Sequence, residues 1–294
     1  MEKNAKSRVM MLFCMTIFGT LPLFVKNITL TSAQISFYRS VIATAVILIY
    51  LLLKGEKISF KDAKKDLLPL AFSGVAIGFN WVFLFEAYKY TTVSSATLAY
   101  YFSPVIVVFI SILFLREKCE RKDVFCFVFS IIGMVLITGV QGTSSVPNHA
   151  KGVFLGLCAA LLYALVVITN KRIKAVSGVH RTLFQFIVCI PVLFAYLMIS
   201  GEGVGVPVGV METACLATLG VVHTGVAYCL YFSSVVKLPA HTTAFYSYVD
   251  PLVCLIVSAV FLSEKMSFLQ IVGAIFILGS TLVGETYSLW RKKT

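Results

Sequence analysis

Two charged side chains stand inside long apolar stretches of this 294-residue chain. Asp250 is the twelfth residue of an apolar span over 239–262, and Arg39 is the seventh residue of a span over 33–53. A charge near the middle of a bilayer costs about 3 kcal/mol or more, so ionisable residues at that depth usually mark functional sites. Asp250 and Arg39 are therefore the first candidates for chemistry.

The carboxyl group of Asp250 allows a functional and a structural interpretation. It can be the counter-ion of a cationic substrate group, or it can bind a proton in one conformation, because burial favours the neutral form of a carboxyl group. It can also make a structural hydrogen bond, since the matching position in the first half of the chain is Ser103, which has no carboxyl group. The substitution Asp250→Asn tests proton binding: any pH-driven activity should be lost, and full activity would exclude the idea.

Arg39 also has two possible roles. It can pair with Glu86, at the start of the loop that follows the third span, and act as a structural clamp between helices. It can instead hold the carboxylate of a substrate, and a double-mutant cycle would separate the two roles. Glu86 is either a member of a proton-coupling set or a solvated loop residue.

His223 and Asn80 are polar residues that also lie deep within spans. His223 is the one histidine near the middle of a span, at a depth similar to that of Asp250, so a proton relay between the two is one hypothesis. Hydrogen-bonded packing is the other. The side chain of Asn80 either joins two helices or contacts a ligand.

Aromatic residues concentrate at the same depth as Asp250. A carboxylate beside tyrosines suits an amine or a quaternary ammonium group, because each ring adds a cation–π attraction of about 0.5 to 2 kcal/mol. It also suits a zwitterionic or aromatic metabolite. Residues four apart share a helix face, which groups Tyr246 with Asp250, and Thr97 with Tyr101. The candidate substrate-binding residues are Asp250, Tyr246, Tyr248, Tyr101, Thr97, Tyr228, Asn80, Trp81 and Arg39, and the candidate proton-coupling residues are Asp250, His223 and Glu86.

The elements that position these residues are predicted to be membrane-spanning helices. Of the 294 residues, 59% are hydrophobic and only 13% are charged, and the apolar residues form blocks near the roughly 20 residues that a helix needs to cross a bilayer. Uniformly apolar blocks favour helices over a barrel, whose strands would alternate. Ten spans are predicted, over 9–25, 33–53, 67–85, 93–115, 124–140, 152–170, 182–200, 211–236, 239–262 and 268–289.

An internal repeat divides the chain into residues 1–147 and 148–294. The segment SPVIVVFISILFLREK at 103–118 returns as DPLVCLIVSAVFLSEK at 250–265, and the same offset pairs Gly78 with Gly225 and Pro104 with Pro251. Five spans per half is an odd number, so equivalent ends lie on opposite sides of the membrane. Inverted repeats of this kind are typical of alternating access around a central site. The predicted fold is therefore an all-α membrane protein of ten helices, arranged as two inverted five-helix repeats around a central cavity.

The basic residues predict how the chain is oriented. With a cytoplasmic N-terminus, the inner segments hold 20 of the 25 Lys and Arg residues and the outer loops hold four. This bias follows the positive-inside rule and places both termini in the cytoplasm. It also accounts for the formal net charge of +12 without nucleic acid as a partner.

Two segments of the chain resemble a known family. FEAYKYTTVSSATLAYYFSPVIVVFISILFLREK and SYVDPLVCLIVSAVFLSEK look like the EamA-type transporters of the drug/metabolite transporter superfamily. The resemblance implies that spans 1 to 4 and 6 to 9 line the cavity, whereas spans 5 and 10 are peripheral. It also implies a substrate among amino acids, amines, sugars, nucleotide derivatives or drugs, with export common in bacteria.

Helix-distorting and small residues indicate where the helices bend or meet. Pro22, Pro104 and Pro251 lie within or near span centres, and they are either gating hinges or residues that only shape their helices. Small residues permit close helix contacts, which are expected at Gly74, Gly78, Gly152 and Gly156.

Other functional classes lack the residues that they need. An aspartyl intramembrane enzyme needs two deep carboxylates, and only Asp250 lies deep within a span. The sequence has no GxSxG, HExxH or P-loop motif, which serine enzymes, zinc enzymes and ATPases would need. We therefore expect no enzyme, catalytic residue, metal or cofactor. The favoured function is proton-linked export of a small polar or amphipathic metabolite across a plasma membrane by a monomer or homodimer. Import of a cationic nutrient is the alternative, and counterflow would exclude a passive channel.

Overall fold

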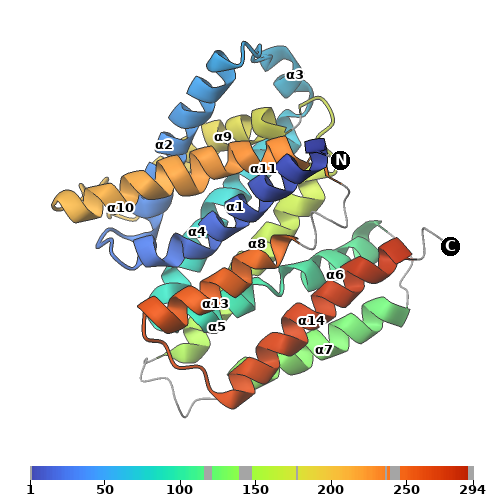
Figure 1. Ribbon diagram of the computed structural model, residues 1–294. Coiled ribbons are helices and arrows are strands. Elements are labelled where there is room, and N and C mark those ends of the chain that lie inside the picture. The colour runs from blue at the N-terminus through green and yellow to red at the C-terminus, as the bar shows by residue number, and fades with distance from the viewer. Residues whose placement is uncertain are drawn as a thin grey trace.

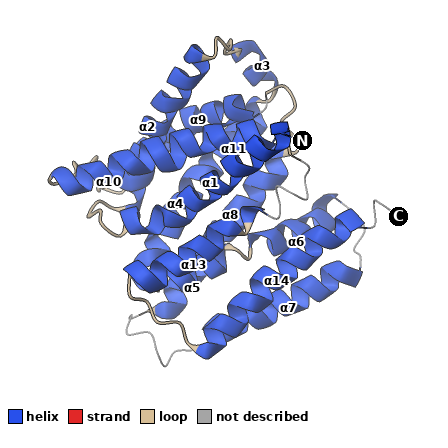
Figure 2. Ribbon diagram, in the orientation of Figure 1, coloured by secondary structure: helices blue, strands red, loops and turns tan. Residues whose placement is uncertain are grey.

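The computed structural model describes residues 2–115, 121–138, 148–176, 178–235, 237–238 and 246–290. Within these residues all regular secondary structure is helical and there is no strand (Figure 2). Six of the described helices are long and apolar enough to cross a membrane, and three further apolar helices are shorter. The prediction of an all-α membrane protein is confirmed for this part of the chain.

Each predicted span contains a helix, although the start of the ninth span, 239–245, lies outside the described residues. The first half contains α1 (Glu2–Val25), α2 (Ser32–Leu53), α3 (Phe60–Lys65), α4 (Leu67–Tyr90), α5 (Val93–Tyr100), α6 (Ser103–Leu115) and α7 (Arg121–Thr138). The second half contains α8 (His149–Asn170), α9 (Gly178–Ile199), α10 (Val210–Gly220), η1 (Val221–Val226), α11 (Ala227–Val235), α13 (Val249–Phe261) and α14 (Phe268–Trp290).

The fourth predicted span is two helices rather than one bent helix. The helical structure is interrupted at Tyr101 and Phe102, so Pro104 is the second residue of α6. In the second half, Pro251 is the third residue of α13. Proline fits the first turn of a helix because the backbone N–H that it lacks would have no intrahelical acceptor there. Pro104 and Pro251 therefore stand at helix starts, whereas Pro22 lies inside α1.

Polar side chains fix where several helices begin. Thr31 caps α2 and forms a capping box with Gln34, while Ser59 caps α3, a short helix inside a predicted loop. Ser267 and Gln270 exchange side-chain to backbone hydrogen bonds at the start of α14. Each cap satisfies backbone donors that the first turn leaves free.

The helices pack so that each half contacts the other along most of its length. In Figure 1, α1, α2, α9, α10 and α11 lie together, while α5, α6, α7, α13 and α14 form the opposite part. The helix α4 packs against both α8 and α9, and α1 packs against both α11 and α13. The pair α7 and α14 lies at the edge (Figure 1), as the family resemblance implies for spans 5 and 10.

Four glycines make the close helix contacts that the sequence predicts. A Cβ atom added at Gly74 would lie 2.6 Å from the carbonyl oxygen of Gln185, and one added at Gly78 would lie 2.7 Å from Sγ of Cys189. At Gly152 and Gly156 the nearest atoms would be 2.6 Å and 2.9 Å away. These helices approach too closely for any side chain, so this prediction is confirmed.

Candidate substrate-binding site

Arg39 is buried between α2, α4 and η1, with 3% of its surface exposed. Its guanidinium carbon lies 4.1 Å from the ring centre of Trp81 and 5.6 Å from that of Phe85. Its Nε donates a hydrogen bond to the hydroxyl of Thr224, which in turn donates to the carbonyl of Leu219. No carboxylate among the described residues forms an ion pair with Arg39.

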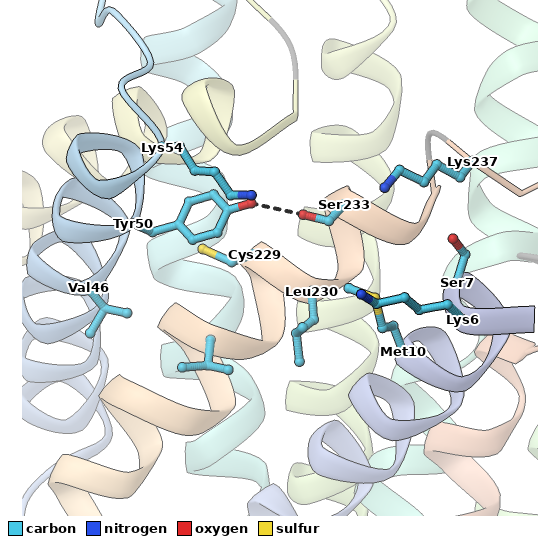
Figure 3. Close-up of a pocket in the computed structure, with 11 residues that line it drawn as sticks. Lys6, Ser7, Met10, Val46, Tyr50, Lys54, Cys229, Leu230, Ser233 and Lys237 are labelled. Atoms are coloured by element: carbon cyan, nitrogen blue, oxygen red, sulfur yellow. Dashed lines mark hydrogen bonds between the residues drawn. The ribbon is translucent and has the colours of Figure 1, made fainter. Parts of the chain in front are cut away.

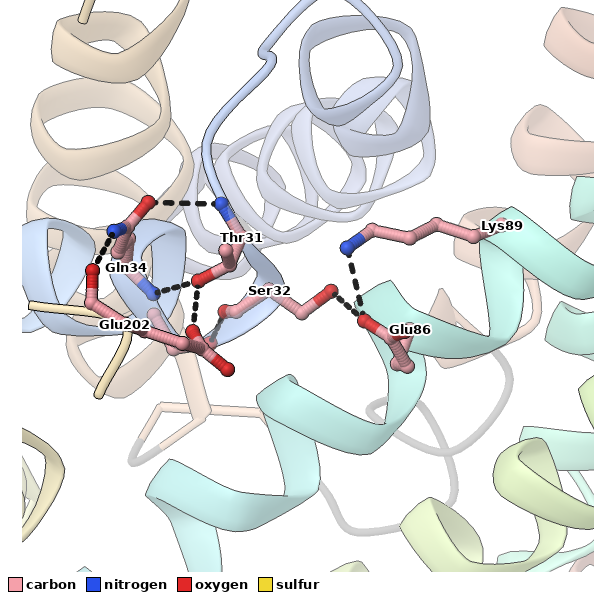
Figure 4. A network of polar contacts seen from close by, with 7 residues as sticks. Thr31, Ser32, Gln34, Glu86, Lys89 and Glu202 are labelled. Carbon is pink, nitrogen blue, oxygen red and sulfur yellow. Dashed lines mark hydrogen bonds and ion pairs between the residues drawn. The ribbon is translucent and has the colours of Figure 1, made fainter. Parts of the chain in front are cut away.

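The predicted clamp between Arg39 and Glu86 is wrong. Glu86 accepts a hydrogen bond from the hydroxyl of Ser32 at 2.7 Å and pairs with Lys89 at 2.9 Å (Figure 4). Trp81 and Phe85 are four residues apart and form the face of α4 that contacts Arg39. Glu86 follows Phe85 directly, and one residue turns a helix by about 100°, so its side chain points away from that face.

Asp250 belongs to a ladder of polar contacts between α5 and α13. The Tyr101 hydroxyl donates a hydrogen bond to the Asp250 carboxylate. One turn further along both helices, the Thr97 hydroxyl lies 3.2 Å from Sγ of Cys254. A third rung joins Ser94 and Ser258. The sequence prediction that Thr97 and Tyr101 share a face is confirmed, and Asp250 lies opposite that face.

Three tyrosines connect the surroundings of Arg39 and Asp250. Tyr88 on α4, Tyr100 on α5 and Tyr228 on α11 lie close enough to interact electrostatically with both charged residues. Arg39 and Asp250 form no ion pair with each other, so the three tyrosines lie near two separate ionisable groups of opposite sign. The thiols of Cys14 and Cys254 also lie close enough to Asp250 to interact with it electrostatically.

His223 lies in η1, the π-helical turn that also carries Thr224. Its Nε2 is 3.0 Å from the Thr20 hydroxyl, its Nδ1 is 3.3 Å from the Thr218 carbonyl, and the Phe24 ring packs 4.7 Å away. His223 and Asp250 have different hydrogen-bond partners, and α1 contacts the elements that carry both. An added Cβ on Gly19 would lie 2.6 Å from the Asp250 carbonyl, and the next residue is Thr20.

The other predicted site residues have separate surroundings. Asn80 is buried, and its Nδ2 donates to the Ala159 carbonyl at 2.6 Å, which joins α4 to α8. Tyr246 packs against the cluster formed by Met11, Met15 and Leu238. Tyr248 precedes the first residue of α13. The structure therefore brings Arg39, Trp81, Tyr101, Thr97, Tyr228 and Asp250 toward one region, with Asn80 in a helix contact and Tyr246 in a hydrophobic cluster.

Four neighbours of Arg39 are absent from the predicted set: Phe85, Tyr88, Tyr100 and Thr224. Tyr88 follows Trp81 by seven residues and Phe85 by three, so helical spacing alone puts it on the same face. That signal is readable from the sequence. Thr224 has no such signal, because the π-helix shifts its direction relative to a regular α-helix.

The comparison with protein families decides what kind of protein this is. The model described as the EamA-like transporter family matches residues 6–139 and again residues 150–284. The chain belongs to this family. It is thus a multi-pass membrane transporter and not an enzyme, as the sequence predicts.

Characterised and uncharacterised relatives agree with this assignment. The chain is 27% identical over 277 residues to the uncharacterized transporter YxxF of Bacillus subtilis, a match that covers 94% of this chain and 88% of the relative. It is 25% identical to solute carrier family 35 member G1 of Mus musculus, over 93% and 76% of the two chains. The pseudopaline exporter CntI of Pseudomonas aeruginosa is 27% identical over 66% of this chain and 65% of its own length.

A solved crystal structure shares the fold. It aligns over 99% of both chains with a TM-score of 0.65 and 18% sequence identity. A likeness at this identity establishes the arrangement of helices alone.

Proposed function

We propose that this transporter carries a small zwitterionic metabolite of the amino-acid type, with Arg39 binding its carboxylate and Asp250 binding its amine. The supporting observation is that these two opposite charges share three tyrosine neighbours but have no ion-pair partner among the described residues. A lone charge held in a poorly solvated site is costly. A ligand that carries both groups compensates both charges at once.

The aromatic surroundings support a ligand with an apolar or aromatic body. Tyr88, Tyr100 and Tyr228 lie near both charged residues. An ammonium group beside such rings would gain cation–π attraction in addition to its pairing with Asp250. A purely cationic nutrient would place a positive charge near the guanidinium of Arg39. The geometry therefore favours a zwitterion over the cationic alternative.

Alternating access by two inverted repeats is supported by reciprocal contacts. An added Cβ on Gly78 of α4 would lie 3.4 Å from Cγ of Leu193 on α9, and one on Gly225 of η1 would lie 2.5 Å from Cγ1 of Val46 on α2. Gly225 is Gly78 plus 147, and Leu193 is Val46 plus 147. Contacts between equivalent residues of the two halves are what an approximate two-fold axis would produce, and they support ten helices in two inverted repeats.

Proton-linked export across the plasma membrane is the mode of transport that we infer. The likeness to the pseudopaline exporter CntI supports the direction, and the excess of Lys and Arg in alternate loops supports cytoplasmic termini. Asp250 and His223 are the groups that we assign to proton coupling. The contacts of His223 suit both of its states, because Thr20 can donate to Nε2 of the neutral ring or accept from the charged ring while donating to Ile17.

Counterflow in liposomes tests the proposed substrate class. A screen of the common amino acids comes first, followed by comparison of the best substrate with its decarboxylated amine and its deaminated acid. We expect the intact amino acid to exchange fastest. We also expect Arg39→Gln to abolish the preference for the amino acid over its amine, and Asp250→Asn to abolish the preference over its acid.

Two results would contradict the proposal. If neither substitution changes the order of the three ligands, Arg39 and Asp250 do not bind the charged groups. If flux does not saturate and shows no counterflow, the protein is a passive channel.

A further inference from the structure

A cavity lies at the ends of α1, α2 and α11 (Figure 3). Its volume is about 750 Å³. Lys6 comes from the first turns of α1, Lys54 caps the end of α2, and Lys237 follows α11. In Figure 3 the ammonium ends of these lysines turn toward the space between the helices, and the described lining residues include no carboxylate.

The walls of this cavity are layered from charged to apolar. On α2, Lys54 is followed one turn deeper by Tyr50 and another turn deeper by Val46. On the opposite wall Lys237 follows Ser233 by four residues, and the hydroxyls of Tyr50 and Ser233 lie 3.1 Å apart. Lys6 and Met10 repeat this spacing on α1. Each wall thus carries a cation at the mouth and a less polar side chain below it.

The cavity is separate from the central site in this conformation. Val46 forms part of its lining and also packs tightly on Gly225, where an added Cβ would lie 2.5 Å away. Arg39 lies seven residues from Val46 along α2, about 10 Å at 1.5 Å per residue. The contact of α2 with η1 therefore stands between the lysines and Arg39.

We propose that this cavity is an anion-binding site for a carboxylate or phosphate group attached to an apolar body. Lys6, Lys54 and Lys237 are exposed, and three cations around one concave space concentrate anions. The apolar layer below them contributes by excluding water from the body of the ligand. The hydroxyls of Tyr50 and Ser233 add hydrogen bonds at the boundary. A soluble organic acid and the headgroup of an anionic phospholipid both have this chemistry.

Saturation-transfer NMR on the full chain in phosphatidylcholine nanodiscs tests the site. The probes are phenylacetate and phenyl phosphate, with phenylacetamide as the uncharged match. We expect both anions to bind, and the triple variant Lys6→Gln/Lys54→Gln/Lys237→Gln to weaken them at least fivefold. The matched control is Lys57→Gln/Lys61→Gln/Lys64→Gln, which removes three charges from exposed lysines outside the cavity and should leave binding unchanged.

A parallel experiment identifies the source of the anion. Native mass spectrometry of the same proteins in mixed phosphatidylglycerol and phosphatidylcholine counts retained anionic lipids. Loss of probe binding in the triple variant assigns a soluble anion, and loss of phosphatidylglycerol adducts alone assigns a lipid headgroup; either result supports the site. Equal behaviour of the triple variant and its control in both experiments would overturn it.

The central site does not affect this test. Arg39→Gln should keep anion binding in the cavity even where it alters transport. Thermal unfolding and gel filtration of each variant establish that the fold is retained. Failure of the transport hypothesis therefore leaves the anion-binding result interpretable, and the reverse also holds.

Discussion

The guanidinium of Arg39 is buried, lies against the ring of Trp81 and donates to one hydroxyl group, that of Thr224. Burial of an unpaired charge destabilises a folded protein, so such a residue is retained where it serves a ligand. Contact with the Trp81 ring, together with the Nε hydrogen bond to Thr224, restricts the direction of the remaining donors. Lysine has neither the planar group nor the Nε donor.

Arg39→Lys should therefore impair transport although it keeps the charge. We expect the initial rate of counterflow to fall at least about tenfold, equivalent to about 1.4 kcal/mol. The control is Lys89→Arg, which makes the opposite exchange in an exposed pair with Glu86 and should change the rate less than twofold. Equal rates for the wild type and Arg39→Lys would mean that a point charge is sufficient at this position.

The two acidic candidates for proton coupling should behave differently. Glu86 is 32% exposed and pairs with Lys89, whereas Asp250 is surrounded by Tyr101 and the tyrosines near Arg39. We expect Glu86→Gln to retain transport driven by a pH gradient and Asp250→Asn to lose it. Uptake and counterflow in liposomes with and without the gradient separate coupling from binding. Loss of coupling in Glu86→Gln would transfer the proton-binding role to the surface pair.

At the scale of the elements, the repeated Glu–Lys ending of the sequence motif has a structural explanation in the second half. Glu264 accepts hydrogen bonds from the backbone amides of Val93 and Ser94 at 2.7 Å and 3.1 Å. Its carboxylate thus caps the first turn of α5, where free N–H groups and the helix dipole favour a negative charge. The matching Glu117 lies outside the described residues.

The glycine at the contact between α2 and η1 should be required for stability. Gly225→Ala places a Cβ 2.5 Å from Cγ1 of Val46, so the two elements must separate, and we expect a loss of about 1 to 3 kcal/mol in the free energy of unfolding. Gly279→Ala in α14 is the matched control, because no atom lies within 4 Å of the added Cβ. Thermal unfolding in detergent compares the two. A similar unfolding midpoint for both variants would show that η1 accommodates the added methyl group without loss of stability.

The sequence predicts most of this architecture because lipid forces long apolar helices. The spans, the glycine contacts and the shared face of Thr97 and Tyr101 all follow from spacing. The break at Tyr101 and Phe102 does not, since a short interruption made of aromatic residues leaves the apolar pattern intact. The surroundings of Arg39 depend on a π-helical turn and on the rotation of α4, neither of which has a distinct sequence pattern.

At the scale of the whole molecule, carboxylates near the starts of two helices bind opposite turns. Asp66, which precedes α4, accepts from the backbone amides of Lys174 and Ala175 between α8 and α9. Glu212, in the first turn of α10, accepts from the amides of Thr29 and Leu30 between α1 and α2. Each half therefore binds the connection between the first two spans of the other half. This reciprocity extends the relation between Gly78 and Gly225 to the ends of the bundle.

If the halves are inverted, equivalent surface positions must face opposite sides of the membrane. Lys64 and Met211 differ by 147 positions and are both exposed, Met211 to 73%. Met211 is expected on the outer side and Lys64 on the cytoplasmic side. A membrane-impermeant maleimide should therefore label Met211→Cys in intact cells, and Lys64→Cys only after the membrane is permeabilised. The unsubstituted protein gives the background from its own cysteines, of which Cys14, Cys189, Cys215, Cys229 and Cys254 are buried. Labelling of both positions from one side would mean that the two halves run in the same direction, and the reciprocal contacts would then require a different symmetry.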